Sequence, residues 1–450
     1  MKYNDLIGKI FQKGKEKFDD MEAYIETSKA ISIGVFQGEV DKYSIAESGG
    51  LSFRGVSNSK MGYSYTEKLD ETSIDMLIDE AYENASFIES AEDEEIFGGS
   101  DKYTEVNVYN EKLSQSSMEE KINLAKELEK KALSLDKRVT SVQMCGYQEF
   151  EQTNTIVNTK GVDLSQKTNG GVIYISVVVK EEEDTKTAMA FRSFSDLEKI
   201  NIEEIAKEAV EEAISLLGAT PIKTGEYPMI IKNTVFGDLL SFVSSVFSAE
   251  YVDKGLSLLK DKIDEKIASE IVTLVDNPFL AGGFGSRSFD DEGMSTSKKN
   301  IIHNGVLTTY LHSLKTAKKF NTTATGNSKR NSYKSPLSIA PSNFYVQAGD
   351  SSLEDMISSI ENGVYIIDVA GLHSGLNPVS GDFSLSASGY EIKSGKINRP
   401  INQITIAGNL YKVFNDIEAI GNDLIFGFPS SSYFGSPSIK ISSISVAGDN

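Results

Sequence analysis

The sequence is poor in the residues that most often build metal and redox sites. Its 450 residues include one cysteine, three histidines and no tryptophan. A single cysteine, Cys145, excludes an intramolecular disulfide, a thiolate zinc cluster and an iron–sulfur centre. The histidines are His303, His312 and His373, and no two of them have the spacing of a metal-binding pair on one helix. This scarcity limits the chemistry that the chain can do alone.

Positive charge and long apolar runs are also scarce. Lysine and arginine number 45 against 66 aspartates and glutamates, which gives a formal net charge of −21. This balance argues against nucleic acid and anionic lipid as partners, because both require a concentrated basic face. The longest largely apolar run, residues 172–179, is far shorter than a membrane span, and the N-terminus has no apolar signal-peptide core. We therefore expect a cytoplasmic protein with no membrane segment and no nucleic-acid partner.

The first half of the sequence contains a repeat. Apolar residues in 74–88 and in 202–216 have the same helical spacing, displaced by 128 positions. Any two amphipathic helices share such spacing, but each of these also closes a similar unit. The units open with predicted helices at 5–18 and 118–135 and continue with alternating strands, which include a hairpin across Gln37-Gly38. We interpret the first half as a duplicated αβ unit.

After Pro221 the pattern changes to many short strands, frequent glycine turns and few helices. The strongest helix candidates here are residues 236–263 and 353–361, and a phase break at Ser442-Ser443 predicts a β-bulge. The predicted fold class is therefore α+β, with duplicated antiparallel αβ units followed by a strand-rich α+β domain. The predicted boundaries are an N-terminal unit at 1–89, a polar linker at 90–117, a second unit at 118–220 and the C-terminal domain at 222–450.

One loop, residues 371–383, is the best functional candidate. The sequence has no phosphate-binding loop, dinucleotide fingerprint or serine nucleophile elbow. The loop combines three glycines, an Asn-Pro step and a His-Ser pair between apolar strands, which indicates a backbone that closely approaches a ligand or partner. A tight internal crossover, with glycine at positive φ, explains the same pattern equally well. The candidate residues are His373, Ser374, Gly375, Asn377, Pro378, Gly381 and Asp382.

Several blocks of the chain together carry a family resemblance: residues 371–384, 389–390, 400–410, 289–293 and 324–327, with 54–55, 62–64 and 80–81 near the N-terminus. These blocks resemble the TldD/PmbA family, and in particular its PmbA (TldE) branch. The resemblance covers essentially the whole chain and implies a two-component cytosolic metallopeptidase. In that family, TldD-type chains carry a His-Glu-x-x-x-His helix whose histidines bind zinc and whose glutamate is the natural general base.

The same resemblance implies that this chain lacks the zinc motif. Ser241, Phe242 and Val246 stand where histidine, glutamate and histidine are needed, and residues 428–433 lack the family's further cysteine ligand. We therefore expect no catalytic residue and no metal in this chain, and zinc in a TldD-type partner. Because Val243 and Phe247 are also apolar, we expect side chains to fill the space that the metal would occupy.

The implied function is that of a non-catalytic subunit. It would form a heterodimer with a TldD-type zinc metallopeptidase and help to build the chamber for peptides or unfolded segments. Two alternatives remain open from the sequence. One is a homodimeric peptide-binding or scaffold protein, and the other is a stand-alone hydrolase that recruits a metal through His373 and Asp382.

Overall fold

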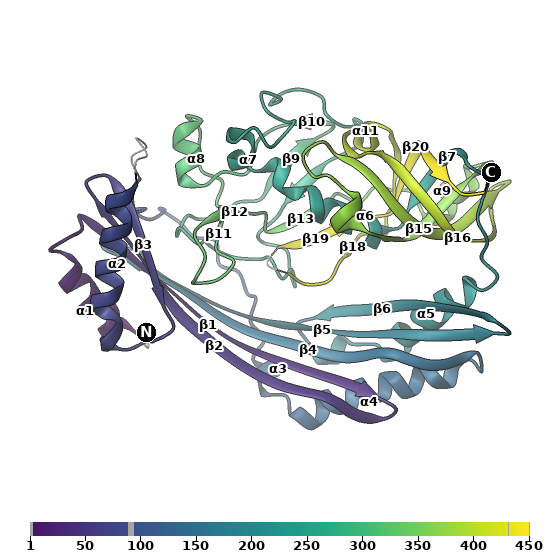
Figure 1. The fold of residues 1–450 in the computed structure, drawn as a ribbon, viewed down its shortest axis with the longest axis horizontal. Coiled ribbons are helices and arrows are strands. Elements are labelled where there is room, and N and C mark those ends of the chain that lie inside the picture. Colours follow the sequence, from purple (N-terminus) through teal and green to yellow (C-terminus); the bar gives the residue numbers. More distant parts are fainter. Residues whose placement is uncertain (1–2, 89–93, 431, 450) are drawn as a thin grey trace.

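Six strands between Asp20 and Phe194 form one long curved sheet, and the C-terminal domain lies over one face of it (Figure 1). The computed structural model describes residues 3–88, 94–430 and 432–449. The strand order is β3-β2-β1-β4-β5-β6, and every neighbouring pair is antiparallel. The strands are β1 (Asp20–Phe36), β2 (Glu39–Ser57), β3 (Lys60–Thr66), β4 (Val139–Asn158), β5 (Asp163–Glu181) and β6 (Asp184–Phe194).

The two repeated units join through their first strands. β1 pairs with β4 from Glu22↔Asn158 to Gly34↔Gly146, so both units share one sheet. The predicted hairpin is confirmed, with Phe36 opposite Glu39, although its strands are longer than the sequence pattern indicated. Between the units, residues 94–110 contain neither helix nor strand, and α3 (Glu111–Gln115) follows them.

Two pairs of helices cover the same face of this sheet. Side chains alternate between the faces of a strand, so alternate residues of β1 form one row. At one end of the row, Ala23 and Ile25 share an apolar cluster with α1 (Asn4–Gly14) and α2 (Ile74–Phe87). At the other end, Ile31, Ile33 and Val35 pack with α4 (Met118–Leu135) and α5 (Ile202–Ser215).

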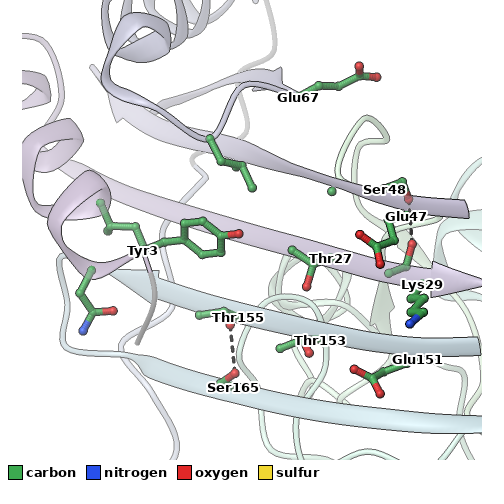
Figure 2. A pocket seen from close by; sticks show the side chains of 15 residues that line it. Tyr3, Thr27, Lys29, Glu47, Ser48, Glu67, Glu151, Thr153, Thr155 and Ser165 are labelled. Carbon is green, nitrogen blue, oxygen red and sulfur yellow. Dashed lines mark hydrogen bonds between the residues drawn. The ribbon is translucent and has the colours of Figure 1, made fainter. Parts of the chain in front are cut away.

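Between the helix pairs the same row is polar. Thr27 and Lys29 of β1 lie there beside Thr153 and Glu151 of β4 (Figure 2). These residues line an open groove of about 660 Å³. The groove lies between the two pairs of helices, with Asn4 and Ile7 of α1 at one end, because each repeated unit covers only its own end of the sheet.

The C-terminal domain contains two further six-stranded sheets around a large apolar core. Their orders are β10-β9-β8-β13-β19-β18 and β16-β15-β14-β7-β20-β17, and β11 pairs with β12 alone. Most pairs are antiparallel, whereas β7–β14 and β13–β19 are parallel. The strands are β7 (Gly225–Ile231), β8 (Leu274–Asp276), β9 (Lys299–His303), β10 (Val306–Leu307), β11 (Ser328–Lys329), β12 (Ser338–Ile339), β13 (Asn343–Val346), β14 (Asn362–Ala370), β15 (Asp382–Lys393), β16 (Lys396–Asn409), β17 (Ile417–Ile420), β18 (Ile425–Phe426), β19 (Tyr433–Ser436) and β20 (Ile439–Ala447).

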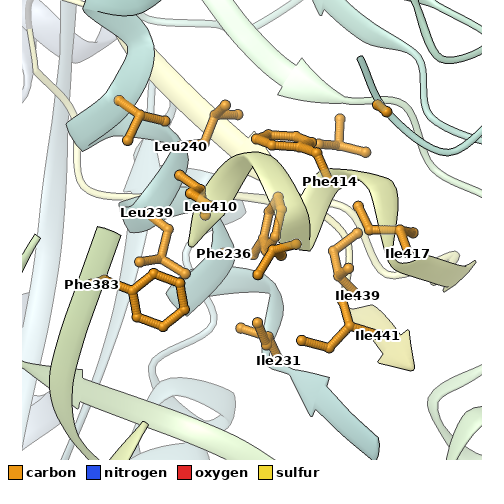
Figure 3. Close-up of a cluster of buried hydrophobic side chains, with 14 of the residues drawn as sticks. Ile231, Phe236, Leu239, Leu240, Phe383, Leu410, Phe414, Ile417, Ile439 and Ile441 are labelled. Atoms are coloured by element: carbon orange, nitrogen blue, oxygen red, sulfur yellow. The ribbon is translucent and has the colours of Figure 1, made fainter. Parts of the chain in front are cut away.

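Helix α6 (Asn233–Val243) passes through this core (Figure 3). Its buried residues Phe236, Leu239 and Leu240 belong to the same apolar cluster as Phe414 and Ile439. The remaining helices of the domain are short: α7 (Ala249–Asp253), α8 (Leu314–Lys319), α9 (Leu353–Ser358), α10 (Leu372–Gly375) and α11 (Leu410–Asn415). The predicted α+β class is therefore confirmed. Among the described residues, no helix is long and apolar enough to cross a membrane.

The predicted helix over residues 236–263 is wrong beyond its first part. α6 ends at Val243, and a 3₁₀ turn (Ser244–Phe247) follows it. Ser248 then adopts an extended conformation and accepts a hydrogen bond from the Glu250 N–H as the N-cap of α7. Serine side chains bond to nearby backbone in this way, which favours caps over helix interiors. Apolar residues keep the helical spacing across this break, so the sequence pattern did not reveal where the helix ends.

The bulge predicted near Ser442-Ser443 is confirmed, because the β7–β20 register shifts between Ile441 and Ile444.

A buried charge network connects the N-terminal sheet to the C-terminal domain. Glu22 of β1 is fully buried, and its Oε1 lies 2.8 Å from Arg54 Nη2 and 3.4 Å from Arg330 Nη2. Arg330 follows β11 of the C-terminal domain and packs over the rings of Tyr24 and Tyr63, with centroids 5.0 and 5.8 Å from its Cζ. Arg54 has a second carboxylate, Glu292, at 3.9 Å. Two buried guanidinium groups thus share one carboxylate oxygen, so removal of that carboxylate would be costly.

Candidate functional site

The positions that the resemblance aligns with the zinc motif lie at the end of α6. One face of the helix is buried in the core, and Ser241 and Phe242 are half-buried, with Phe242 packed against that core. Val246 lies in the following 3₁₀ turn and is buried beside Phe247. Phe242 and Val246 therefore both contribute to the apolar core at this end of the helix.

The candidate loop 371–383 folds through tight turns at its glycines. Gly371 has a φ of +90° and precedes α10, and its carbonyl accepts hydrogen bonds from the N–H groups of Ser374 and Gly375 at 3.1 and 2.7 Å. Gly381 has a φ of +78°. A Cβ on Gly375 would lie 2.3 Å from the Ser384 carbonyl oxygen. Positive φ at Gly371 and Gly381 and close packing at Gly375 and Gly381 therefore account for these glycines within the chain itself, as in the crossover alternative.

The polar residues of the loop mainly bind the loop itself. The Asn377 Oδ1 accepts hydrogen bonds from the N–H groups of Val379 and Ser380, the two residues that follow Pro378. Asp382 accepts a hydrogen bond of 2.8 Å from the Asn409 side chain, and this bond holds the pKa of Asp382 below its usual value. His373 and Ser374 are exposed.

The structure brings this loop and the end of α6 together at two places. The rings of Phe242 and His373 meet edge to face, with centroids 4.9 Å apart. Val246 and Gly381 line the same apolar cavity of about 20 Å³. A cavity so small and so apolar is expected to stay dry. Val243, Val246 and Phe247 thus surround only a very small apolar space at this end of the helix.

These side chains do not fit a zinc ion. Ser241 provides one hydroxyl, Phe242 and Val246 provide no ligand atom, and zinc sites use imidazole, thiolate or carboxylate groups. In the part of the chain that the structure describes, no three His, Cys, Asp or Glu side chains are placed to hold a metal.

His312 is buried against aromatic rings, and burial lowers its pKa to about 4, so it is neutral at pH 7.

Sequence reasoning missed one carboxylate on α6. Asp238 lies one turn before Phe242, and Asp368 at the far end of β14 is close enough for the two charges to interact. Both side chains are solvent-accessible, but surrounding protein and the charge of Asp368 raise the pKa of Asp238 to about 6. The available signal was a lone acidic residue within the otherwise apolar run 235–243.

All three parts of the chain match domain models of one family. Residues 224–448 match the PmbA/TldA metallopeptidase C-terminal domain, residues 111–217 its central domain and residues 21–85 its domain 1. A "Metalloprotease" of Methanothermobacter thermautotrophicus is 25% identical over 94% of this chain and 92% of its own.

Two solved structures share the fold over nearly the whole chain. A protein of Thermotoga maritima, described as a modulator of a DNA gyrase, is 30% identical, with a TM-score of 0.91 over 99% of this chain and 100% of its own. TldE from Thermococcus kodakarensis is 24% identical, with a TM-score of 0.90 over 98% of this chain and 100% of its own. The domain matches, which together span most of the sequence, show that this chain belongs to the PmbA/TldD metallopeptidase family.

Proposed function

We propose that this chain is a PmbA/TldE-type subunit of a two-component cytoplasmic metallopeptidase. It forms a heterodimer with a TldD-type chain, which carries the zinc, and it helps to form the chamber for peptides or unfolded segments. The zinc-activated water and the general base both belong to the partner, so this chain's own residues bind and position rather than cleave.

The observation that carries this proposal is the end of α6. A catalytic zinc needs about three protein ligands and a base at a site open to substrate. Here Val246 is buried in the core, and the Phe242 ring lies against His373 instead of opening toward a substrate. The likeness in fold to a solved TldE supports the same branch of the family.

The two alternatives make different demands on the same residues. A stand-alone hydrolase that recruits a metal through His373 and Asp382 would need a further protein ligand beside them. Among the described residues, no group of three His, Cys, Asp or Glu side chains is placed to hold a metal. This arrangement disfavours the hydrolase. The homodimeric scaffold differs from our proposal only in its partner, so the nature of the assembly decides between them.

The purified chain alone is expected to contain no stoichiometric zinc and to cleave no peptide. The reason is that the three motif positions offer one hydroxyl as their only ligand atom. Elemental analysis after dialysis against zinc, together with a casein cleavage assay, measures both properties. One tightly bound zinc per chain, with cleavage that a chelator abolishes, would make this chain a metallopeptidase in its own right.

A further inference from the structure

A cleft separates the N-terminal sheet from the C-terminal domain. It has a volume of about 410 Å³, and β5, β6 and α5 line one side while α6, β14 and β18 line the other. Figure 1 shows β18 and α6 above β6, with α5 at the end of the sheet. Asp238, one turn before Phe242 on α6, lies in its wall. The cleft therefore begins beside the candidate site.

A serine hydroxyl lies at the floor of this cleft. Ser176 of β5 is 6% exposed and lines the cleft. Within the described ranges of the chain, its side chain makes no hydrogen bond to another residue, and its Oγ is open to the cleft. The hydroxyl can therefore donate a hydrogen bond to a molecule that enters the cleft.

Apolar side chains beside Ser176 are also left uncovered. Met189 is the cross-strand partner of Ser176, and Phe428 reaches the sheet from the C-terminal domain. They are 40% and 42% exposed. Phe428 contacts Phe191 with ring centroids 5.4 Å apart. An apolar wall of this kind suits the aliphatic stem of a long side chain.

The charges that line the cleft leave two carboxylates in excess. Arg192 pairs with Glu208 at 2.6 Å, and Lys232 pairs with Glu212. Asp238 and Asp368 have no ion pair within residues 3–88, 94–430 and 432–449. Burial raises the pKa of both groups, and the charge of Asp368 raises that of Asp238 further, whereas the charge of Lys232 acts in the opposite direction on Asp368.

We propose that this cleft binds a peptide through a lysine or arginine side chain. The cationic head lies between Asp238 and Asp368, the methylene stem crosses Met189 and Phe428, and the Ser176 hydroxyl bonds to the peptide backbone. The inference rests on the proposed function for the peptide nature of the ligand, and it names the class of residue that the peptide presents.

The test measures binding of fluorescein-labelled, blocked peptides to the full purified chain by fluorescence anisotropy. One peptide has a single central lysine in an Ala/Gly/Ser background, and its match has norleucine there, which keeps the stem and removes the charge. The lysine peptide is expected to bind about tenfold more tightly, because a charged hydrogen bond contributes roughly that factor. Equal affinity of the two peptides, or no binding of either, would overturn the inference.

Substitutions of residues that line the cleft test whether the peptide binds there. Asp238→Asn and Asp368→Asn are each expected to weaken the lysine peptide about tenfold and to leave the norleucine peptide unchanged. Ser176→Val should weaken both peptides. Asp350→Asn, at an exposed carboxylate outside the cleft, is the matched control and should change neither. Circular dichroism verifies that each variant is folded. Full affinity in both aspartate variants would contradict the assignment.

The peptide-binding test can fail or succeed independently of the test of the proposed function. If the lysine peptide does not bind while the chain still assembles with a TldD-type partner, this inference fails and the proposed function stands. If the peptide binds in the cleft and no such assembly forms, the reverse holds.

Discussion

Replacement of Glu22 by glutamine is expected to lower the free energy of unfolding by about 3–5 kcal/mol, the range found when one member of a buried ion pair is removed. Glu22 is fully buried, and its Oε1 lies close to both Arg54 and Arg330. Glutamine has the same shape but no charge, so two buried guanidinium groups would lose their shared counter-ion. The change also falls where the two parts of the chain meet, so it should loosen their contact.

Guanidinium denaturation of the wild type and the variant measures this loss. Glu39→Gln is the matched control, because Glu39 pairs with Lys126 at 3.3 Å on the surface and its side chain is 87% exposed. That change should cost no more than about 1 kcal/mol. If Glu22→Gln lowers the free energy of unfolding no more than Glu39→Gln does, then the buried network does not hold the domains together as described.

Restoring the zinc motif is expected to damage the fold and not to create an enzyme. The triple variant carries Ser241→His, Phe242→Glu and Val246→His. Val246 is 2% exposed and lines an apolar cavity of about 20 Å³, which has no room for an imidazole. Phe242→Glu also removes the ring that packs on His373. Overpacking together with a buried polar group should cost about 3 kcal/mol or more.

The measurements are thermal unfolding, zinc content and casein cleavage. Ser241→His alone is the control, because Ser241 is half-buried at the surface of α6 and should tolerate the change within about 1 kcal/mol. A triple variant that folds like the wild type, binds one zinc and cleaves peptides would show that an intact catalytic site surrounds α6.

Local signals in the sequence predicted individual elements well. The helix predicted over 118–135 is α4 (Met118–Leu135), because Ser117 and Glu120 form a capping box that fixes its start. The pairing of β1 with β4 could not be predicted in this way, since Glu22↔Asn158 joins residues far apart in the chain. The end of α6 was missed because its apolar spacing runs on into the 3₁₀ turn.

The candidate site was predictable in part. Residues 371–383 and the positions Ser241, Phe242 and Val246 followed from the sequence and its family resemblance. Their meeting, through Phe242 with His373 and Val246 with Gly381, is a tertiary contact that no local pattern encodes. The cleft was beyond prediction for the same reason, because its lining residues come from both parts of the chain.

The central claim is that this chain works as the zinc-free partner of a TldD-type metallopeptidase. The most direct test combines it with a family member from the same genome that carries the His-Glu-x-x-x-His motif. Light scattering after size-exclusion chromatography gives the mass, and casein cleavage gives the activity. We expect a one-to-one complex whose cleavage requires both chains and is abolished by a chelator. Separate elution of the two chains, with the zinc-bearing chain equally active alone, would contradict the claim.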